Sequence, residues 1–289
     1  MKAFIFAAVV FVFSAFTGGI ACAQAVSGSQ PQPFPKVTIP ASEVRTLKSS
    51  STGRDYELYI HLPSNYAQDQ TRKYPALYIL DGQWDFKLMD SVLGGLVYDK
   101  FVPEMILVGI TYPGEHADYN ALRAMDYTPV PAHGLKGSGD GPKFLKFVKT
   151  ELVPFIESNY RADASRRFLQ GSSLGGLFTL YALFSDPGFF SGYIAANPAV
   201  TNGEGYAFKQ EAEYARTHKE LPAKLYLVVG GLEELNAPVE EFIQTVRSRS
   251  YAGLKLETRV VEGERHAGNK PEIYNRGLRF VFSDTGTSR

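Results

Sequence analysis

The chain has 289 residues, of which 44% are hydrophobic, and it carries 30 basic and 30 acidic residues. This length and apolar content predict one large domain with its own core. The balanced charge gives no indication of a nucleic-acid-binding surface or of a polyanionic substrate, so we expect no nucleic-acid partner.

Residues 1–23 have the pattern of a secretory signal peptide. Lys2 provides a short positive start, residues 3–16 form an apolar run too short to span a bilayer comfortably, and Ala21-Cys22-Ala23 is an A-x-A cleavage site. We expect a secreted or periplasmic protein that is cleaved near Ala23 and has no membrane span afterwards. A retained membrane anchor and a lipoprotein linked through Cys22 are the alternatives. Cleavage removes the only cysteine, so the mature protein would depend on core packing rather than disulfides.

The next segment, residues 24–41, is rich in Ser, Gln, Pro and Gly and is typical of a flexible linker. A single domain is then predicted over residues 42–283. Its first elements are residues 44–47 and 56–60, which alternate in polarity like two antiparallel strands of a hairpin.

Continuous apolar runs at residues 74–80 and 105–110 predict strands that are buried on both faces. A helix at 86–98 between them predicts a parallel pair with a right-handed crossover. Further strands are expected at 192–196, 225–229 and 256–261, and further helices at 143–160, 239–251 and 271–282. The sequence therefore predicts an α/β fold in which helices cover both faces of a mostly parallel central sheet and an antiparallel hairpin comes first. The polar segment 112–142 is long for a loop, which indicates that it has a function or covers something.

The motif Gly171-x-Ser173-x-Gly175 has the pattern of a nucleophile elbow. In this turn a strand runs directly into a helix, and the central residue takes a strained conformation that exposes its hydroxyl. The motif alone is weak, because glycine and serine are common in loops. Here an apolar pair, Phe168-Leu169, precedes it and helical periodicity over residues 177–184 follows it, which favours Ser173 as a nucleophile.

A serine nucleophile needs a base to take its proton. Of the five histidines, His61 lies in a strand pattern, His116 and His133 lie in the long loop, and His218 lies in a charged, solvated stretch. His266 lies between the last strand and the last helix, at the edge of the sheet where the elbow is expected. We predict His266 as the base, with an ordinary surface-loop histidine as the alternative.

The histidine in turn needs an acid that fixes its tautomer and stabilises its charge. In α/β-hydrolases the chain order is serine, acid, histidine, so the acid should follow the strand predicted at 225–229. Glu233 and Glu234 both stand there. We favour Glu233, because its spacing from Gly230 fits a turn that aims a carboxylate at the histidine loop, and Glu234 is the alternative.

An oxyanion hole needs two backbone donors. One should be the amide of Leu174, and the other should come from the turn at Gly82-Gln83, although an ordinary β-turn is the alternative there. Trp84 follows this turn and should border the acyl site. Arg123 could bind an anionic group of the substrate or could simply pair with Asp126.

Several segments, taken in order, resemble one protein family; they are residues 77–83, 126–129, 144–147, 154–157, 171–176 and 263–266. They are similar to the esterase family of α/β-hydrolases that includes esterase D, enterochelin-type siderophore esterases, feruloyl and acetylxylan esterases, and mycolyltransferases. The resemblance extends over roughly residues 47–282. It implies an α/β-hydrolase fold with Ser173 as nucleophile, His266 as base and Glu233 as acid, where many relatives carry aspartate. It also implies an oxyanion amide near Gly82 or Gln83.

The sequence and this resemblance together predict an exported serine carboxylic-ester hydrolase that works through an acyl-enzyme intermediate. A small-molecule or oligomeric ester is the expected partner, either a siderophore ester or a feruloyl or acetyl ester. The formylglutathione branch fits less well, since it is intracellular and carries cysteines. No metal cluster or cofactor motif is present in the sequence, so we expect no cofactor and no metal. An acyltransferase and a catalytically dead binding protein are the alternatives, and we expect a monomer or weak dimer.

Overall fold

The computed structural model describes residues 37–283. The predicted signal peptide, residues 1–23, lies outside the described residues, as does all but the last part of the predicted linker at 24–41. The described residues from Ile39 to residue 283 form one compact unit, and every predicted site residue lies within it.

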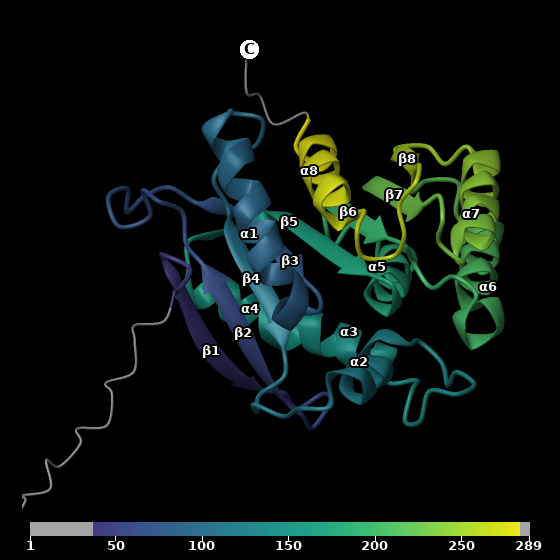
Figure 1. Cartoon of the computed structure of the whole chain (residues 1–289), viewed down its shortest axis with the longest axis horizontal. Helices are drawn as coiled ribbons and strands as arrows, with labels where there is room; N and C mark the ends of the chain where they lie inside the picture. Colours follow the sequence, from purple (N-terminus) through teal and green to yellow (C-terminus); the bar gives the residue numbers. More distant parts are fainter. Residues whose placement is uncertain (1–36, 284–289) are drawn as a thin grey trace, which may run out of the picture. The chain divides into compact units, whose positions relative to one another are not determined.

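The centre of this unit is an eight-stranded sheet in the order β1-β2-β4-β3-β5-β6-β7-β8. Its strands are β1 (Ser42–Lys48), β2 (Asp55–His61), β3 (Tyr74–Ile79), β4 (Ile106–Thr111), β5 (Ala162–Ser172), β6 (Gly192–Ala196), β7 (Lys224–Gly230) and β8 (Lys255–Val261). The pairs β1–β2 and β2–β4 are antiparallel, and the other neighbouring pairs are parallel (Figure 1). The predicted α/β fold, with an antiparallel hairpin ahead of a mostly parallel sheet, is confirmed.

Helices cover both faces of the sheet (Figure 1). They are α1 (Gly82–Tyr98), α2 (Tyr119–Tyr127), α3 (Gly141–Phe147), the π-helical segment η1 (Val148–Leu152), α4 (Val153–Asn159), α5 (Leu174–Ser185), α6 (Asn202–Thr217), α7 (Asn236–Arg249) and α8 (Lys270–Val281). Helices α1 and α8 share one buried apolar cluster with one face of the sheet, and the remaining helices share the cluster on the other face.

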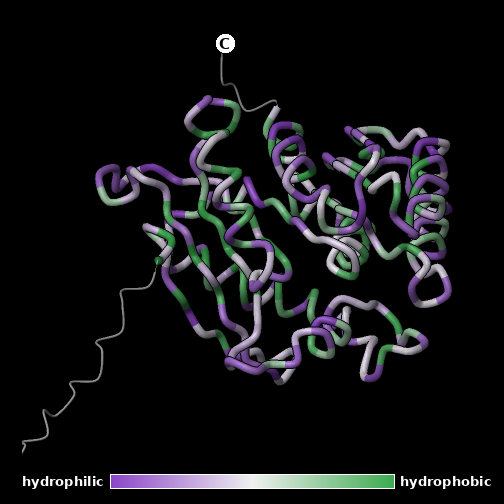
Figure 2. Tube along the Cα trace, viewed as in Figure 1, coloured by the Kyte–Doolittle hydropathy of each residue, from purple (hydrophilic) through white to green (hydrophobic). Residues whose placement is uncertain are grey.

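The central strands are buried on both sides, as their apolar runs predict. Every residue of β3 and of β4 is buried. Along β3 the side chains alternate, so that Leu77 and Ile79 pack towards α1 and α8 while Tyr78 packs against the opposite face. Figure 2 shows this as hydrophobic stretches along the strands at the centre of the sheet. Burying one such side chain contributes about 1.5–3 kcal/mol, and this core holds the strand ends in register.

The helix predicted at 143–160 is interrupted at its middle by η1. Pro154 stands in the first turn of α4, where it has no N–H to donate to the preceding turn. A π-helical turn is a common way to absorb such a break without ending the helix. Helix α1 also begins earlier than predicted, at Gly82 instead of residue 86, so that it starts directly after β3.

Two helices were not predicted. α2 lies inside the predicted loop 112–142, and α6 follows β6. Gly203, Glu204 and Gly205 at the start of α6 have left-handed backbone angles, and these turn-like residues hide the helix behind them. α2 is amphipathic, but it is short and lies in a segment rich in glycine, proline and polar residues, which hides it in the sequence.

The anchor of α2 is a buried carboxylate, Asp126. It accepts hydrogen bonds from the hydroxyls of Tyr56 and Tyr112, each 2.9 Å long, and forms an ion pair with Arg54. Burial raises the pKa of Asp126 above its ordinary value, although Arg54 opposes this change. The segment 112–142 therefore packs through α2 on α3 and α5, and a buried polar cluster links it to Tyr56 of β2.

Candidate active site

Ser173 occupies the turn between β5 and α5, with φ 60° and ψ −119°. This left-handed φ is sparsely populated for a residue with a side chain, so the turn is strained and must be maintained by its surroundings. Ser173 is partly exposed, whereas its neighbours Ser172 and Leu174 are buried. The structure thus gives this serine the strand–turn–helix setting of a nucleophile elbow.

Two glycines at the elbow, the first one of the motif and Gly176 just after it, have a measurable steric reason. A Cβ atom at Gly171 would lie 2.2 Å from the carbonyl oxygen of Gly175, and one at Gly176 would lie 2.9 Å from the carbonyl oxygen of Ala196. Real side chains do not reach such distances, so α5 can pass β5 and the end of β6 this closely only where these Cβ atoms are missing. The amide of Ser173 donates to the carbonyl of Ala196 at 3.0 Å, which fixes the turn to the end of β6.

Next to Ala196, the buried side chain of Asn197 joins the ends of neighbouring strands to the histidine loop. Its Nδ2 donates to the carbonyl of His266 at 2.9 Å, and its Oδ1 accepts from the amide of Gly230 at 3.0 Å. Its amide group also exchanges hydrogen bonds with Asn269, at 3.0 and 2.8 Å. Since Ala196 holds the elbow and Asn197 holds the histidine loop, Ser173 and His266 are both tied to one strand end.

His266 lies beside Glu233. Its Nδ1 is 3.1 Å from Oε2 of Glu233, with side-chain exposures of 41% for the histidine and 11% for the glutamate. The contact is within ion-pair distance, but the carboxylate is off the line of a straight ring N–H hydrogen bond. Catalytic hydrogen bonds are often loose without substrate and tighten when it binds. Because Nδ1 faces the acid, Nε2 is the ring nitrogen left for a serine hydroxyl.

The backbone explains why Glu233 rather than Glu234 faces the histidine. The amide of Glu233 donates to the carbonyl of Gly230 at 3.1 Å, which closes a tight turn after β7. The amide of Leu232 donates to the carbonyl of Glu264 at 2.9 Å, so the turn is bonded to the histidine loop. A Cβ atom at Gly230 would lie 2.6 Å from that same carbonyl, so only glycine permits this approach. Glu234 is exposed.

The two turns expected to form an oxyanion hole both begin helices. α1 starts at Gly82 and α5 starts at Leu174, so the amides of Gln83 and Leu174 have no acceptor within their own helices. In the part of the chain that the structure describes, no other group accepts a hydrogen bond from these two amides. A Cβ atom at Gly82 would lie 2.8 Å from the backbone of Gly109, so glycine lets the turn settle against β4.

Arg123 does not pair with Asp126; its partner is Asp81. The guanidinium of Arg123 donates to both carboxylate oxygens of Asp81, at 2.7 Å each, and to the carbonyl of Ser172 at 3.3 Å. Asp81 has a left-handed φ of 56° and immediately precedes Gly82. Burial raises the pKa of Asp81 and Arg123 opposes this change. Arg123 therefore links the predicted oxyanion turn to the residue before Ser173.

Trp84 borders the pair formed by Arg123 and Asp81. Its side chain is 48% exposed, and its ring lies 5.6 Å from the guanidinium of Arg123 and 6.1 Å from the ring of Tyr119. Gln83 accepts from the hydroxyl of Thr111 at 2.8 Å, and its Nε2 has no acceptor among the described residues. An aromatic surface and an unused amide donor thus lie next to the predicted oxyanion turn.

Sequence reasoning missed Asn197 and Asp81. Asn197 stands directly between a buried parallel strand and a proline, and Asp81 ends another buried strand just before a glycine. Polar residues at the carboxyl ends of parallel strands were the available signal, because ligand sites in open α/β sheets form there.

Among the described residues, no group of three or more His, Cys, Asp or Glu side chains is placed to hold a metal ion. No described helix is long and apolar enough to cross a membrane.

Comparison with known proteins shows which protein family this chain belongs to. The family described as "Putative esterase" matches residues 49–270, so this chain belongs to it. The chain is 28% identical to the ferri-bacillibactin esterase BesA of Bacillus subtilis (strain 168) over 270 residues, which cover 86% of this chain and 92% of BesA. It is 31% identical to the siderophore triacetylfusarinine C esterase of Aspergillus fumigatus over 178 residues, 60% of each chain. An IroE-like serine hydrolase from Shewanella oneidensis superposes with a TM-score of 0.76 at 25% identity, over 86% of this chain and 82% of that one. The chain is thus an α/β-hydrolase of the esterase family, and the predicted enzyme class, a serine esterase, is confirmed.

Proposed function

We propose that this protein is an exported serine esterase that hydrolyses a siderophore ester, with Ser173 as nucleophile, His266 as base and Glu233 as the acid behind it. The observation that carries the proposal is the strained, partly exposed Ser173 at an edge of the sheet where His266 and Glu233 lie 3.1 Å apart. These residue types in this arrangement perform acyl transfer on several unrelated folds.

The proposed reaction has two halves. In the first, the Ser173 hydroxyl attacks the ester carbonyl while Nε2 of His266 takes its proton, and the amides of Leu174 and Gln83 stabilise the negative charge on the carbonyl oxygen. The tetrahedral intermediate then expels the alcohol, which receives the proton from His266. In the second, a water molecule attacks the acyl-enzyme with the same base, which releases the acid and restores Ser173. Glu233 keeps the imidazole oriented and stabilises its positive charge.

The choice of substrate rests on the relatives and on the site. Two relatives that match this chain are named as esterases of ferri-bacillibactin and of a siderophore. The exposed ring of Trp84 offers a stacking surface for a ligand beside the reacting ester. A feruloyl or acetyl ester is the second candidate from sequence, but the ferulic acid esterase that superposes on this chain is 20% identical and supports the fold alone.

Export is part of the proposal and rests on residues 1–23 of the sequence. Fractionation of cells that express the full chain, with mass spectrometry of the amino terminus, tests it. We expect a mature protein in the periplasm or medium that begins after Ala23. An uncut protein retained in the membrane fraction would contradict export.

The substrate is tested by a hydrolysis screen of the purified protein on three classes of compound: tri-catecholate and hydroxamate siderophore esters, feruloyl and acetyl-xylan esters, and short acyl esters. We expect the highest kcat/KM on a siderophore ester. Reaction with a fluorophosphonate probe separates the remaining alternatives. No labelling of Ser173 would indicate a dead binding protein, and transfer of the acyl group to an added alcohol in preference to water would indicate an acyltransferase.

A further inference from the structure

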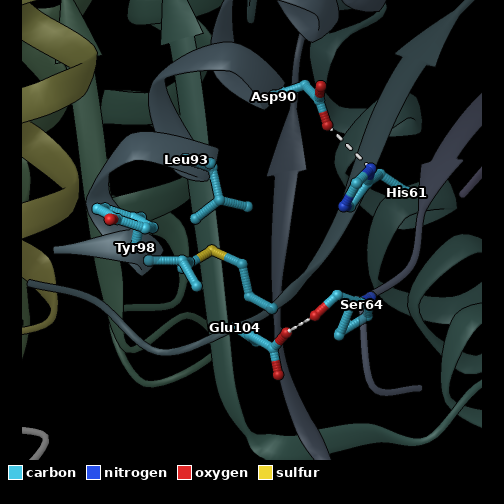
Figure 3. Close-up of a pocket in the computed structure, with 10 residues that line it drawn as sticks. His61, Ser64, Asp90, Leu93, Tyr98 and Glu104 are labelled. Atoms are coloured by element: carbon cyan, nitrogen blue, oxygen red, sulfur yellow. Dashed lines mark hydrogen bonds and ion pairs between the residues drawn. The ribbon is translucent and has the colours of Figure 1, made fainter. Parts of the chain in front are cut away.

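A cavity of about 380 Å³ lies away from the residues proposed for catalysis, between β2, the second half of α1 and the segment before β4. Its ten lining residues are His61, Pro63, Ser64, Asp90, Leu93, Gly94, Val97, Tyr98, Glu104 and Met105. Figure 3 shows Leu93 and Tyr98 on one side of it, and His61, Ser64 and Glu104 on the other. Volumes of this size are typical of small-molecule sites.

The cavity is at the opposite edge of the sheet from the elbow. His61, the last residue of β2, pairs with Leu107 near the start of β4, so the cavity faces the amino ends of the parallel strands. Ser173 follows the carboxyl end of β5, which runs parallel to β3 and so to β4. Helix α1 spans the distance, because it begins at the predicted oxyanion turn and ends beside the cavity at Tyr98.

Two successive glycines in α1 are unexplained by packing. Gly94 and Gly95 stand in the interior of the helix, and a Cβ atom at either would meet no atom within 4 Å. Each glycine costs roughly 1 kcal/mol of helix stability relative to alanine. Gly94 lines the cavity, and the missing side chain there leaves the cavity open. Nothing in the structure explains Gly95.

The polar groups of the cavity are arranged for a cation. Asp90 and Glu104 contribute carboxylates, and the ten lining residues include no lysine or arginine. Nδ1 of His61 lies 2.9 Å from Oδ1 of Asp90, and the hydroxyl of Ser64 donates to Glu104 at 2.5 Å. Glu104 also forms an ion pair with Arg72, at 3.7 Å, although Arg72 does not line the cavity.

The apolar part of the cavity fits the body of such a ligand. Leu93, Val97 and Met105 provide aliphatic and thioether surface, and the ring of Tyr98, 87% exposed, stands beside them. Figure 3 places Leu93 and Tyr98 across the cavity from Glu104, so the body of a ligand whose ammonium group is held at the carboxylate would face this apolar side. A carboxylate ligand would instead face two like charges.

We propose that this cavity is a second ligand site, which binds a small organic ammonium ion with an aromatic or aliphatic body. The ammonium group lies against Glu104 and Asp90, and the body packs on Leu93, Val97 and Met105. The site is separate from the esterase site and does not depend on the function proposed for it.

Phenethylammonium is the probe, and 2-phenylethanol and phenylacetate are its neutral and anionic counterparts. Binding is measured by calorimetry and by the ¹³C-methyl signal of Met105, assigned with Met105→Leu, while Met125 on α2 serves as an internal reference. We expect saturable binding of the ammonium ion with a shift of the Met105 signal. The alcohol should bind at least about tenfold more weakly, a difference of about 1.4 kcal/mol, and the acid should not bind.

The matched variants are Gly94→Leu and Gly95→Leu, which both remove a glycine from the same helix. Gly94→Leu should fill the cavity and weaken binding at least tenfold (about 1.4 kcal/mol), whereas Gly95→Leu should bind like the wild type. Glu104→Gln should bring the ammonium ion and the alcohol to similar affinity. Esterase activity of each variant checks that it is folded. Equal binding by both glycine variants, equal affinity for ammonium ion and alcohol in the wild type, or no saturable binding at all would overturn the proposal.

Discussion

Two histidine–carboxylate pairs stand at opposite edges of the same sheet. His266 lies 3.1 Å from Glu233, and His61 lies 2.9 Å from Asp90, with each pair partly exposed. By distance and burial alone they are alike. They differ in their surroundings: the first is bonded through Asn197 to the strand end that holds a strained serine, and the second borders an apolar cavity.

The comparison teaches that a histidine beside an acid does not identify a catalytic site. A nucleophile on a strained turn and free backbone donors are needed as well. At the first edge Ser173 has a left-handed φ, and the amides of Leu174 and Gln83 lack acceptors among the described residues. At the second edge the hydroxyl of Ser64 donates a hydrogen bond to Glu104, so this hydroxyl is not directed towards His61.

The largest expected effect separates the two edges directly. Ser173→Ala and His266→Ala should each lower kcat for ester hydrolysis on the order of 10⁶-fold, because members of a catalytic unit act together. The double variant should be little worse than either single one. His61→Ala should change kcat by less than about twofold, since it removes no group that touches the reacting atoms. Steady-state kinetics with thermal unfolding as a folding check measures this. Additive losses of kcat in the Ser173 and His266 variants, or a large loss of kcat in His61→Ala, would contradict the assignment of Ser173 and His266 as the catalytic pair.

The acid gives the next largest effect. Glu233→Gln keeps the shape of the side chain but removes the charge that orients and stabilises the imidazolium, so kcat should fall on the order of 10³-fold. The matched controls are Glu234→Gln, its exposed neighbour, and Asp90→Asn, the acid of the other pair. Both should retain nearly full activity. A severe loss in Glu234→Gln with a mild one in Glu233→Gln would transfer the role to Glu234.

The sequence predicted the site around Ser173 better than the surroundings of His61, because the sequence signals for Ser173 are local. A tight strand-to-helix turn demands glycines at fixed spacing, so Ser173 could be recognised from residues 171–175. The continuous apolar runs of β3 and β4 likewise reflect burial on both faces. These patterns place the elbow and the strand ends around it.

The contacts that the sequence did not predict join residues that are far apart in the chain. Asn197 matters because Gly230 and His266 come to it, and Arg123 meets Asp81 instead of its near neighbour Asp126. The sequence places His61 in a strand pattern and gives no sign of its partner Asp90, because Asp90 comes from α1, the helix that follows β3. Helix α2 is amphipathic, but its nine residues lie within a segment rich in glycine, proline and polar residues that was predicted as a loop.

A substitution at Arg123 tests whether its contact with Asp81 holds the predicted oxyanion turn in place. Lysine cannot form the two-pronged contact with Asp81, so Arg123→Lys should loosen the turn that carries the amide of Gln83. We expect kcat to fall roughly tenfold with KM for a neutral ester nearly unchanged, which is a loss of about 1.4 kcal/mol in the transition state. The matched control at the other edge is Arg72→Lys, with no expected effect. A rise in KM confined to anionic esters would instead make Arg123 a substrate-binding residue.

The smallest effect is a pH dependence of stability at the second edge. Burial raises the pKa of Asp90 above its ordinary value of 3.8, and His61 opposes this change. An acid whose pKa is raised by folding binds more protons in the native state, so its contribution to stability is full below about pH 3.8 and is lost as the pH rises through the higher native value.

Asparagine does not titrate, so Asp90→Asn should gain stability relative to the wild type as the pH rises from about 3.5 towards 6. The gain should stay below about 1 kcal/mol, since the pair is partly exposed and solvent screens it. Urea unfolding at several pH values measures it, with Glu115→Gln, an exposed loop acid, as the control that should run parallel to the wild type. A relative gain on acidification would mean that His61 stabilises the Asp90 carboxylate by more than burial costs it. The His61–Asp90 contact would then be a stabilising ion pair, and the strained serine would be the feature that distinguishes the His266–Glu233 site from it.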